Sequence, residues 1–254
     1  MSWRRIIRQG PAIAMLIGLA LSAQPVQAKK IVVYGASGEI GGVIVNEALS
    51  RGHTVIGVSR DPAKLKNGNQ NFTAVAGDVT DLASFQSVTR GADVVIISVS
   101  GSAKDNLPEN SVTAQAARVA TRAFTGVRQS PYVIQVGGAT TMYETKEAMM
   151  AHLPFPAEPG SAAYAMVFGH LVALQTYRAS SIRWTVLTPP SNIDGWSRDG
   201  KLVLKRTGKY RTSTSGLVED ANGNSVVNIA DLAVAAVDEA EQQRFAGKRF
   251  TVGY

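Results

Sequence analysis

Short apolar runs alternate with amphipathic stretches along the chain, and the first such unit is the most regular. The apolar run Ile31–Tyr34 stops at Gly35, and two further glycines, Gly38 and Gly41, follow at three-residue intervals. Apolar residues then recur at helical spacing up to Gly52. This pattern predicts a buried strand, a tight glycine turn and a helix.

The alternation of strand and helix patterns continues to the C-terminus. We expect further strands at Thr54–Ser59, Phe72–Ala76, Ala92–Val99, Tyr132–Val136, Arg183–Thr188 and Phe250–Gly253. We expect a helical turn from Pro62, a helix capped by Asp81, helices at Glu109–Thr125 and Ser161–Arg178, and a last helix near Ile229 with Asp231 as its N-cap. Strands that alternate with helices across short links indicate an α/β fold with a doubly wound parallel sheet. In such a sheet crossovers are right-handed, and ligands bind beyond the carboxyl ends of the strands.

The chain of 254 residues contains no linker and no long repeat, so we expect one domain over residues 29–254. Residues 191–227 are poorly patterned and hold Trp196 and Tyr210. We interpret this segment as a lid or substrate loop, with a plain surface loop as the alternative. Phe155, between two prolines, is a further candidate for lining the pocket.

The first 28 residues differ from the rest of the chain. A basic start with Arg4, Arg5 and Arg8 precedes the apolar run Ala12–Leu21, and small and polar residues follow up to Ala28. This layout predicts a secretory signal peptide cleaved after Ala28, and the adjacent arginines partly match a twin-arginine signal. The apolar run is too short to span a bilayer as a helix, so we expect no stable membrane insertion after cleavage. The mature protein would be periplasmic or secreted; without a functional signal it would be cytoplasmic.

Charge and composition narrow the range of partners. Cleavage would remove three arginines and no acidic residue, which lowers the formal net charge from +7 to +4. The remaining chain has no cluster of Lys and Arg, so we expect no nucleic acid partner. Zero cysteines exclude disulfides and thiol nucleophiles, and His53, His152 and His170 are too scattered to predict a metal site. A small-molecule substrate is the expected partner, and the sequence indicates no oligomeric state.

The glycine turn is the first candidate for chemistry. A turn between a strand and a helix directs free backbone N–H groups and the positive helix end toward one point, which suits a pyrophosphate. Gly35 permits the sharp turn, Gly38 lets phosphates approach the backbone, and Gly41 lets the helix pack closely on the strand. An ordinary strand-to-helix turn is the alternative interpretation.

Arg60 stands at the end of the second strand, where a dinucleotide-binding unit usually has an acid that holds the ribose 2′-hydroxyl of NAD. A carboxylate would repel a 2′-phosphate, whereas a guanidinium binds it with two hydrogen bonds. We therefore predict NADP(H) in preference to NAD(H), with Lys64 nearby and Ser37 as a further hydroxyl donor. In the alternative interpretation Arg60 is solvated and Asp61 binds the ribose.

The end of the third strand offers a second contact. Asp78 and Val79 would flank the adenine of a bound dinucleotide. Asp78 could equally be an ordinary turn residue, because aspartate often bonds its own backbone in turns.

Several motifs together resemble an atypical short-chain dehydrogenase/reductase. They are GASGEIG, SRDPAKL and GDV after the first three strands, and VGGATTMYE, WTVLTPP, VVNIADLAVAAVDE and FTVGY further on. The sequence is similar to the NAD(P)H-binding group that includes NmrA-like proteins and flavin/biliverdin reductases, over Lys30–Tyr254. The resemblance implies a Rossmann-like fold with a nicotinamide cofactor and does not name a substrate.

The resemblance also implies the cofactor contacts. It places the cofactor on Gly35, Ser37, Gly38, Glu39 and Ile40, and it assigns phosphate recognition to Arg60. It further implies that the segment from Ser98 to Gly101 lies against the cofactor ribose and that Pro189 and Pro190 border the nicotinamide.

The sequence departs from this family at the catalytic pair. Typical short-chain reductases use a tyrosine as proton donor and a lysine four residues later that activates it and holds the ribose. Tyr164 falls at the start of the expected long helix, but Phe168 follows four residues on and the helix holds no lysine. Tyr164 and Thr140 (or Thr141) are therefore candidate catalytic residues without the usual support. In the alternative interpretation Tyr164 is a packing residue and His170 a surface residue.

These residues favour an NADPH-dependent oxidoreductase that reduces a small planar acceptor such as a quinone or flavin, because that transfer requires little more than stacking on the nicotinamide. The nicotinamide would lie in a pocket bordered by Thr140, Tyr164, Pro189 and Ile193. Two alternatives stay open, a non-catalytic NAD(P)H-binding sensor of the NmrA-like type and a sugar epimerase-like enzyme. The missing lysine favours the sensor, whereas export opposes it because a transcriptional partner would be absent outside the cytoplasm.

Overall fold

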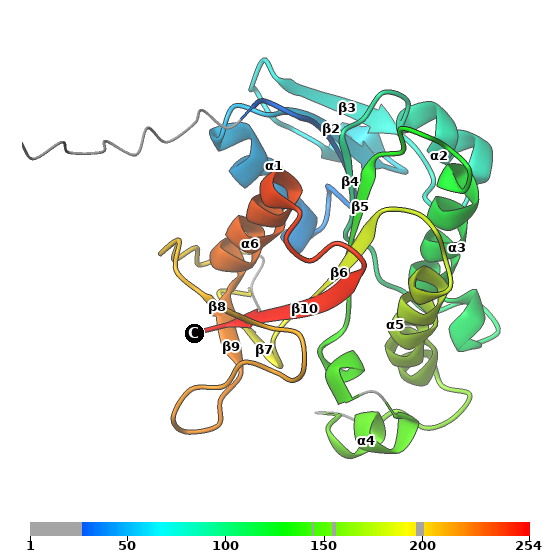
Figure 1. Ribbon diagram of the computed structural model, residues 1–254, viewed down its shortest axis with the longest axis vertical. Helices are drawn as coiled ribbons and strands as arrows, with labels where there is room; N and C mark the ends of the chain where they lie inside the picture. The colour runs from blue at the N-terminus through cyan, green and yellow to red at the C-terminus, as the bar shows by residue number, and fades with distance from the viewer. Residues whose placement is uncertain (1–26, 144, 154–155, 197–200) are drawn as a thin grey trace, which may run out of the picture.

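The computed structural model describes residues 27–143, 145–153, 156–196 and 201–254. Within these residues an eight-stranded sheet has the order β3-β2-β1-β4-β5-β6-β10-β8, in which β8 pairs antiparallel with β10 and the other pairs are parallel (Figure 1). Its strands are β1 (Lys30–Tyr34), β2 (Thr54–Ser59), β3 (Phe72–Ala76), β4 (Val94–Ile97), β5 (Tyr132–Val136), β6 (Trp184–Thr188), β8 (Arg211–Ser213) and β10 (Lys248–Gly253). Two short parallel strands, β7 (Asn192–Asp194) and β9 (Val226–Asn228), pair separately.

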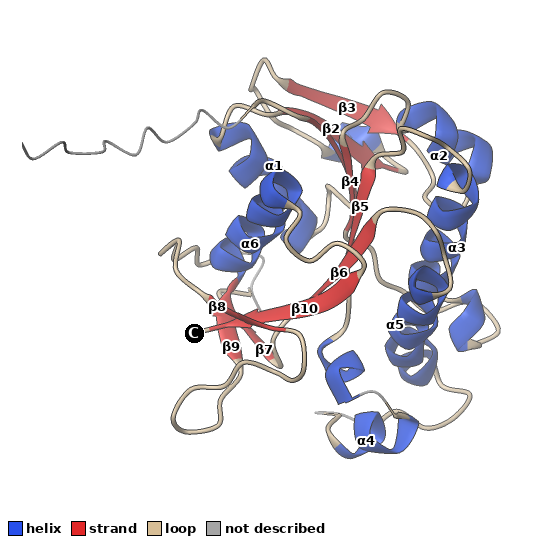
Figure 2. Ribbon diagram, in the orientation of Figure 1, coloured by secondary structure: helices blue, strands red, loops and turns tan. Residues whose placement is uncertain are grey.

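Helices cover both faces of the central sheet (Figure 2). One face carries α1 (Glu39–Ser50) and α6 (Ile229–Gln242), and the other carries α2 (Leu82–Val88), α3 (Val112–Phe124) and α5 (Ala162–Arg178). The short helix α4 (Lys146–Ala151) and three 3-10 turns (Pro62–Lys64, Pro108–Asn110 and Ala139–Tyr143) lie in the connections. Ile31 and Val33 pack toward α1 and α6, whereas Val32 and Tyr34 pack toward the opposite layer. Both faces of β1 are therefore buried, which explains its continuous apolar run.

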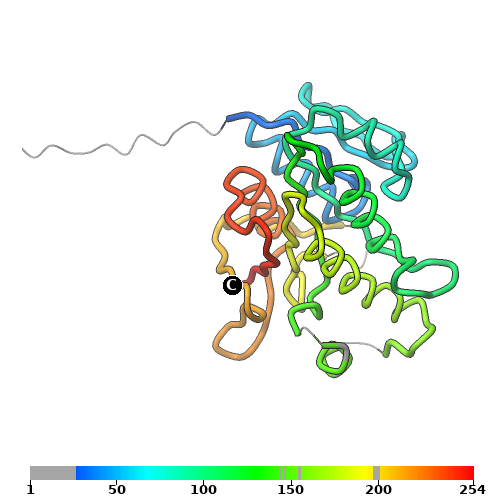
Figure 3. Tube along the Cα trace, turned by 45° about the vertical axis from the view of Figure 1, so that its right-hand side comes forward, coloured from blue at the N-terminus to red at the C-terminus, as the bar shows by residue number. Residues whose placement is uncertain are grey.

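The sheet confirms the predicted doubly wound α/β fold. The chain runs outward from β1 to β2 and β3, and then returns to β4 on the other side of β1. In Figure 3 the early strands β2 and β3, blue to cyan, and the last strand β10, red, accordingly lie toward opposite ends of the sheet. The carboxyl ends of β1 and β4 border the switch point, where such sheets form a binding crevice.

The expected bounds hold to within two residues for most elements, and two elements differ at both ends. The strand expected at Ala92–Val99 is shorter, because the Ala92 amide closes a turn on Thr89 (3.1 Å). The helix expected at Glu109–Thr125 begins only after Ser111, whose side chain accepts a hydrogen bond from a first-turn amide (3.2 Å) and caps α3.

Asp231 does not cap α6, contrary to the sequence prediction. Asn228 is the N-cap, and its side chain accepts a hydrogen bond from the amide two residues on (3.0 Å). Asp231 is buried in the first turn and accepts hydrogen bonds from Thr207 (N at 2.9 Å, Oγ1 at 2.6 Å), the Gly208 amide (2.8 Å) and the Tyr254 hydroxyl (2.8 Å). The carboxylate therefore fixes the preceding loop to α6.

A network of charged side chains joins α1, α6 and the same loop. The Arg51 guanidinium donates hydrogen bonds to Glu47 (2.8 Å), Asp238 (2.6 Å) and Glu241 (3.1 Å). Glu47 also accepts two hydrogen bonds from Arg206, each 2.8 Å long. These bonds, the one from Arg206 first, hold the pKa of the Glu47 carboxyl below its usual value. The part of the expected lid that carries Arg206 is thus attached to the helix layer.

Residues just before β1 are fixed at the edge of the sheet where the amino ends of the parallel strands lie. The Lys29 amide donates a hydrogen bond to His53 Nδ1 (3.2 Å), and His53 Nε2 lies 3.0 Å from the Glu241 carboxylate. Most of the predicted signal peptide falls in residues 1–26, which lie outside the described residues. None of the helices in the described part of the chain has the length and apolar content that crossing a membrane requires.

Candidate functional site

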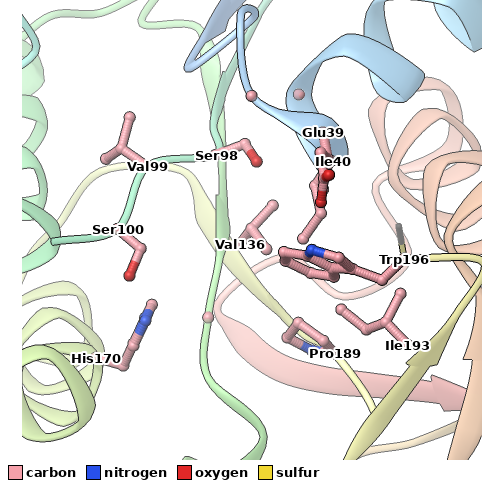
Figure 4. Close-up of a pocket in the computed structure, with 13 residues that line it drawn as sticks. Glu39, Ile40, Ser98, Val99, Ser100, Val136, His170, Pro189, Ile193 and Trp196 are labelled. Carbon is pink, nitrogen blue, oxygen red and sulfur yellow. The ribbon is translucent and has the colours of Figure 1, made fainter. Parts of the chain in front are cut away.

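A cavity of about 330 Å³ opens at the carboxyl edge of the sheet, beside the switch point (Figure 4). The glycine turn and the start of α1 form one wall, and the segment after β4 forms another. The ends of β5 and β6, with α5 and β7, complete it. Four of the predicted cofactor contacts line this cavity, namely Gly38, Glu39, Ile40 and Ser98. Its size falls within the range of small-molecule sites.

The three glycines of the turn have different roles. Gly35 has a φ of +78°, and a Cβ atom on it would lie 2.1 Å from the Ser98 carbonyl oxygen. A Cβ atom on Gly41 would lie 2.1 Å from the Gly35 carbonyl oxygen. A Cβ atom on Gly38 would meet only the Gly35 oxygen, at 3.3 Å. The fold therefore requires Gly35 and Gly41, whereas Gly38 leaves its open side to the cavity.

The first turn of α1 faces the same cavity with free donors. Gly38 is the N-cap and supplies no side chain to bond the first-turn amides. The Gly38 amide bonds the Gly35 carbonyl (2.9 Å), and the Gly42 amide starts the helical ladder on Gly38 (2.8 Å). The amides between them have no intrahelical partner, because the first turn of any helix lacks one. These donors and the positive helix end fit a bound diphosphate.

Glu39 is the one feature of this wall that opposes an anion. Its carboxylate lies at the cavity, and its Oε2 is buried without a hydrogen-bond partner. The side chain has to turn away from the helix end when a diphosphate occupies it, since like charges repel. The flexible stem of Glu39 permits that movement, so the wall as a whole still fits the group.

Arg60 lies exposed at the end of β2 and forms no ion pair with any described residue. Asp61, the alternative ribose ligand, is engaged locally: it accepts a hydrogen bond from the Ala63 amide (3.2 Å) and lies 3.8 Å from Lys64 Nζ. This geometry leaves the guanidinium of Arg60 accessible to a phosphate and makes the Asp61 alternative less suitable.

Two serine hydroxyls stand beside this position. Ser37, in the glycine turn, lies 3.3 Å from Ser59 through their Oγ atoms, and Ser59 Oγ accepts a hydrogen bond from the Asp61 amide (3.2 Å). The two hydroxyls link the glycine turn to the end of β2. A role for the Ser37 hydroxyl as a donor to a 2′-phosphate stays a prediction.

Asp78 and Val79 lie outside the cavity lining. Asp78 Oδ1 accepts hydrogen bonds from the Thr80 amide (2.8 Å) and hydroxyl (2.7 Å). These bonds, with a smaller contribution from Arg60, lower the pKa of Asp78. Val79 is buried in the layer below β3. The turn interpretation of Asp78 therefore has direct support, and an adenine contact stays a prediction.

The far part of the cavity is mostly apolar. Val136 and Pro189, at the ends of β5 and β6, lie beside Ile193 of β7 and the ring of Trp196 (Figure 4). A second hollow of about 560 Å³ shares three of these residues and continues past Pro190. Trp196 is half exposed, so its indole stands between the two hollows. A flat, apolar group could stack on Val136, Pro189, Ile193 and Trp196 without displacing polar contacts of these side chains.

The predicted catalytic residues Tyr164 and Thr140 do not line either hollow. The Tyr164 ring packs on Phe168, with ring centroids 4.4 Å apart, in a small apolar cluster around Met149. Thr140 lies in the 3-10 turn after β5, and the neighbouring Thr141 is buried and donates to the Gly138 carbonyl (2.7 Å). A catalytic role for the first pair stays a prediction. Phe155 lies outside the described residues.

His170 lies in the cavity wall, where its side chain is partly buried, and not on the open surface where the alternative interpretation places it. Burial lowers the pKa of its imidazole to about 4, so the ring is neutral at neutral pH. Sequence reasoning overlooked this residue as a site group. The available signal was a pair of glycines, Gly138 and Gly169, which permit close contacts around it. Among the described residues there is no cluster that could hold a metal ion.

Comparisons with known proteins agree with this geometry. A family model described as NAD(P)H-binding matches residues 35–241, which span the glycine turn and all of the cavity walls. The chain is 28% identical over 233 residues to the uncharacterized protein YwnB of Bacillus subtilis, a match that covers 88% of this chain and 97% of that protein.

Two solved structures are similar over nearly their full length. One is named provisionally as an epimerase from Bacteroides thetaiotaomicron; it is 30% identical, with a TM-score of 0.71 and coverage of 90% of this chain and 98% of that chain. The other is named provisionally as an exported protein from Burkholderia pseudomallei; it is 29% identical, with a TM-score of 0.67 and coverage of 89% and 100%.

Proposed function

The chain belongs to the NAD(P)H-binding family, and from this premise we propose that it is an NADPH-dependent reductase of a small planar acceptor, a quinone or a flavin. It has the NAD(P)H-binding, oxidoreductase-like fold. The observation that carries the proposal is the open N-terminus of α1, which faces a cavity that becomes apolar at its far end.

The chain's own residues suggest how the cofactor would bind. The first-turn amides of α1 would bind the diphosphate over the open side of Gly38. Arg60 would bind the 2′-phosphate, together with the hydroxyls of Ser37 and Ser59. When bound, NADPH supplies the hydride. Pro189 would border the nicotinamide, and the apolar surface of Val136, Ile193 and Trp196 beside it would take the acceptor.

The apolar lining supports a planar acceptor over an alcohol or ketone. Val136, Pro189 and Ile193 offer surface for stacking but no proton donor. Ketone reduction requires a placed acid, whereas a reduced quinone or flavin can take its proton from water. The absence of lysine from α5 and the position of Tyr164 outside the lining agree with this choice.

A titration with paired glycine variants tests nucleotide binding and turnover. Gly38→Val places a side chain in the open space above the helix end, whereas Gly68→Val has no atom within 4 Å of its Cβ and serves as the control. Wild type and the control should bind NADPH and consume it with members of a panel of quinones and flavins. Gly38→Val should lose both activities while keeping its melting temperature within a few degrees. Equal NADPH binding by the two variants would refute the site.

Preference for NADPH is tested at Arg60. Arg60→Ala should weaken NADPH by tenfold or more and leave NADH nearly unchanged, because only NADPH carries the 2′-phosphate. Arg118→Ala, an exposed arginine on α3, is the charge-matched control. An equal loss for both nucleotides would show that Arg60 does not select the cofactor.

A non-catalytic NAD(P)H sensor is the second candidate. The two observations that favour it are the missing lysine in α5 and the position of Tyr164 and Thr140 outside the cavity lining. Tight NADPH binding by wild type without consumption of any acceptor in the panel would support the sensor. An epimerase, the function suggested by the name of one relative, would use NAD and would show sugar-dependent turnover without net cofactor oxidation.

We also propose that the protein is exported after cleavage behind Ala28. The basic, apolar and small-residue segments of the N-terminus support this location, as does the relative that is named provisionally as an exported protein. N-terminal sequencing of protein from a periplasmic fraction should give Lys29 as the first residue. An intact Met1 would refute export by this route.

A further inference from the structure

Basic side chains gather at the edge of the sheet that lies opposite the cavity. The strands β1, β4, β5, β6 and β10 are adjacent in the sheet, and each has a lysine or arginine as its first residue or shortly before it. These residues, which we call the basic edge, are Lys30, Arg90, Arg128, Arg183 and Lys248. Neighbouring strands lie about 4.8 Å apart, so the five positions span roughly 19 Å. The sheet order thus brings together cations that are far apart in the sequence.

The positive charge of the basic edge is not neutralised by the described residues. None of its five side chains forms an ion pair with another described residue. The hydrogen bonds they donate go to neutral groups: Lys30 Nζ donates to the Arg90 carbonyl (3.0 Å), and Arg183 donates to the Gln243 side chain. All of the five except Lys30 are exposed. The edge therefore presents uncompensated charge to solvent.

The acidic groups on this side of the sheet are few and already engaged. The loops that lead into the five strands contain one acid, Asp93, and its carboxylate accepts a hydrogen bond from the Lys30 amide (2.7 Å). Glu239, near the end of α6, is buried and accepts hydrogen bonds from two backbone amides (3.0 Å each). Glu241 binds Arg51 (3.1 Å). These acids leave the edge strongly positive.

Compensation of helix ends does not account for this arrangement. A cation stabilises the C-terminus of a helix within its last turn. Arg128 lies four residues beyond the end of α3, Arg183 five beyond α5 and Lys248 six beyond α6. The loops at the cavity edge carry both signs side by side, as at Lys104 with Asp105. The charge asymmetry between the two edges therefore indicates an anionic partner for the basic edge.

The N-terminal segment joins the fold at the same edge. The Lys29 amide is hydrogen-bonded to His53 (3.2 Å), directly before β1. The apolar run Ala12–Leu21 precedes this attachment in the sequence, so a membrane that takes up the run would lie beside the basic edge. Anionic phospholipids attract clusters of Lys and Arg near a membrane surface. The charge and the position of the N-terminal segment thus favour the same partner.

We propose that the basic edge binds anionic phospholipid headgroups at a membrane surface. This inference does not depend on the proposed function. Before cleavage, the apolar run and the basic edge would act together, and after cleavage the edge alone would give reversible binding, since stable anchoring takes two signals. The cavity lies at the opposite edge of the sheet, so it faces water in the bound protein.

Vesicle sedimentation tests the proposal. Protein without residues 1–28 is used, because the sheet begins at Lys30 and the apolar run would bind lipid by itself. It should bind vesicles that contain phosphatidylglycerol at least tenfold more tightly than vesicles of phosphatidylcholine alone. Salt should release it, because ions screen exposed charges. The double variant Arg128→Gln/Lys248→Gln should lower the partition coefficient by about twentyfold, since each cation contributes roughly fivefold.

A charge-matched variant and a labelled residue serve as controls. Lys104→Gln/Lys209→Gln removes the same charge from exposed positions on the cavity side and should stay within twofold of wild type. Both double variants should keep the melting temperature of wild type within a few degrees. The chain has no cysteine, so a polarity-sensitive fluorophore can be attached at Ala246→Cys, in the exposed loop before Lys248. It should respond to phosphatidylglycerol vesicles, whereas the same label at Ser102→Cys, after β4, should not.

Four results would overturn the inference. The first is equal binding to vesicles with and without phosphatidylglycerol, and the second is an equal loss in both double variants, which would assign binding to net charge alone. The third is a vesicle response at Ser102→Cys and none at Ala246→Cys. The fourth is tighter binding to duplex DNA than to phosphatidylglycerol vesicles, lost in Arg128→Gln/Lys248→Gln, which would make the edge a nucleic acid surface.

Discussion

Replacing Asp231 by alanine distinguishes a tertiary anchor from an ordinary helix cap. The loss of a cap side chain costs about 1 kcal/mol. In the structure the Asp231 carboxylate is fully buried and receives hydrogen bonds from Thr207, Gly208 and Tyr254. Removing it leaves two amides and two hydroxyls without their acceptor.

The expected magnitude follows from these bonds. A hydrogen bond to a charged group contributes about 1.5–3 kcal/mol. Thr207 and Gly208 are exposed, so water can replace part of what they lose. We therefore expect Asp231→Ala to lower the free energy of unfolding by about 3–4 kcal/mol, which corresponds to a melting temperature lower by roughly 10 °C for a domain of this size.

Urea denaturation followed by circular dichroism measures this loss. Asp220→Ala is the matched control, because Asp220 also accepts amide hydrogen bonds, from Asn222 (2.8 Å) and Asn224 (2.9 Å), but in an exposed local turn. It should lose less than about 1 kcal/mol, in the range of surface substitutions and caps. Limited trypsin digestion should cut Asp231→Ala faster at Arg206. A loss of about 1 kcal/mol, equal to that of the control, would refute the anchor.

Three further predictions follow from the site. Gly41→Ala should lower the free energy of unfolding by about 2–3 kcal/mol, because its Cβ would overlap the Gly35 carbonyl and push α1 off the sheet; a melt within 2 °C of wild type (roughly 0.5 kcal/mol) would contradict this. NADPH should change the tryptophan fluorescence of the mature protein, and Trp196→Phe should remove most of that change. The other tryptophan of the mature protein, Trp184, is buried away from the cavity. An undiminished fluorescence change in Trp196→Phe would place the nucleotide elsewhere. The pKa of His170 falls from 6.5 in the unfolded chain to about 4 in the folded protein, so between these values the unfolded state binds an extra proton. Wild-type stability should therefore fall as the pH falls through this window, and His170→Leu should lose this part of the pH dependence, by up to about 3 kcal/mol. Identical pH profiles of stability for the two proteins would show that the ring is not buried in solution.

Local pattern was sufficient to predict the glycine turn and seven of the eight strands of the main sheet, all except β8. Parallel strands that are covered on both faces have continuous apolar sequences, and glycines mark the turn. Both features can therefore be recognised from a few neighbouring residues. The strand at Tyr132–Val136 and the cap at Asp81, which accepts a hydrogen bond from the Ser84 amide (2.6 Å), were predictable for this reason.

The roles of Asp231 and His170 could not be predicted in the same way. Asp231 has the sequence context of a helix cap, and its partner Thr207 lies 24 residues away in a segment without regular pattern. The face that α5 turns to the cavity depends on the contact between Gly169 and Ser111, which joins two helices. Packing between segments that are distant in sequence sets the orientation of α5. The spacing of apolar residues along this helix alone therefore cannot show whether Tyr164 or His170 faces the cavity.

The direction of β1 has a practical consequence for handling the protein. This strand starts at Lys30 on the edge of the sheet opposite the cavity, and five residues at about 3.3 Å each separate its two ends by roughly 15 Å. The final strand β10 runs parallel to β6, so the chain terminates on the cavity side, where the Tyr254 hydroxyl contacts Asp231. A tether, affinity tag or solid support joined ahead of Lys29 should therefore leave the nucleotide entrance accessible. The same attachment at Tyr254 would lie near the entrance and could disturb the loop that is hydrogen-bonded to Asp231.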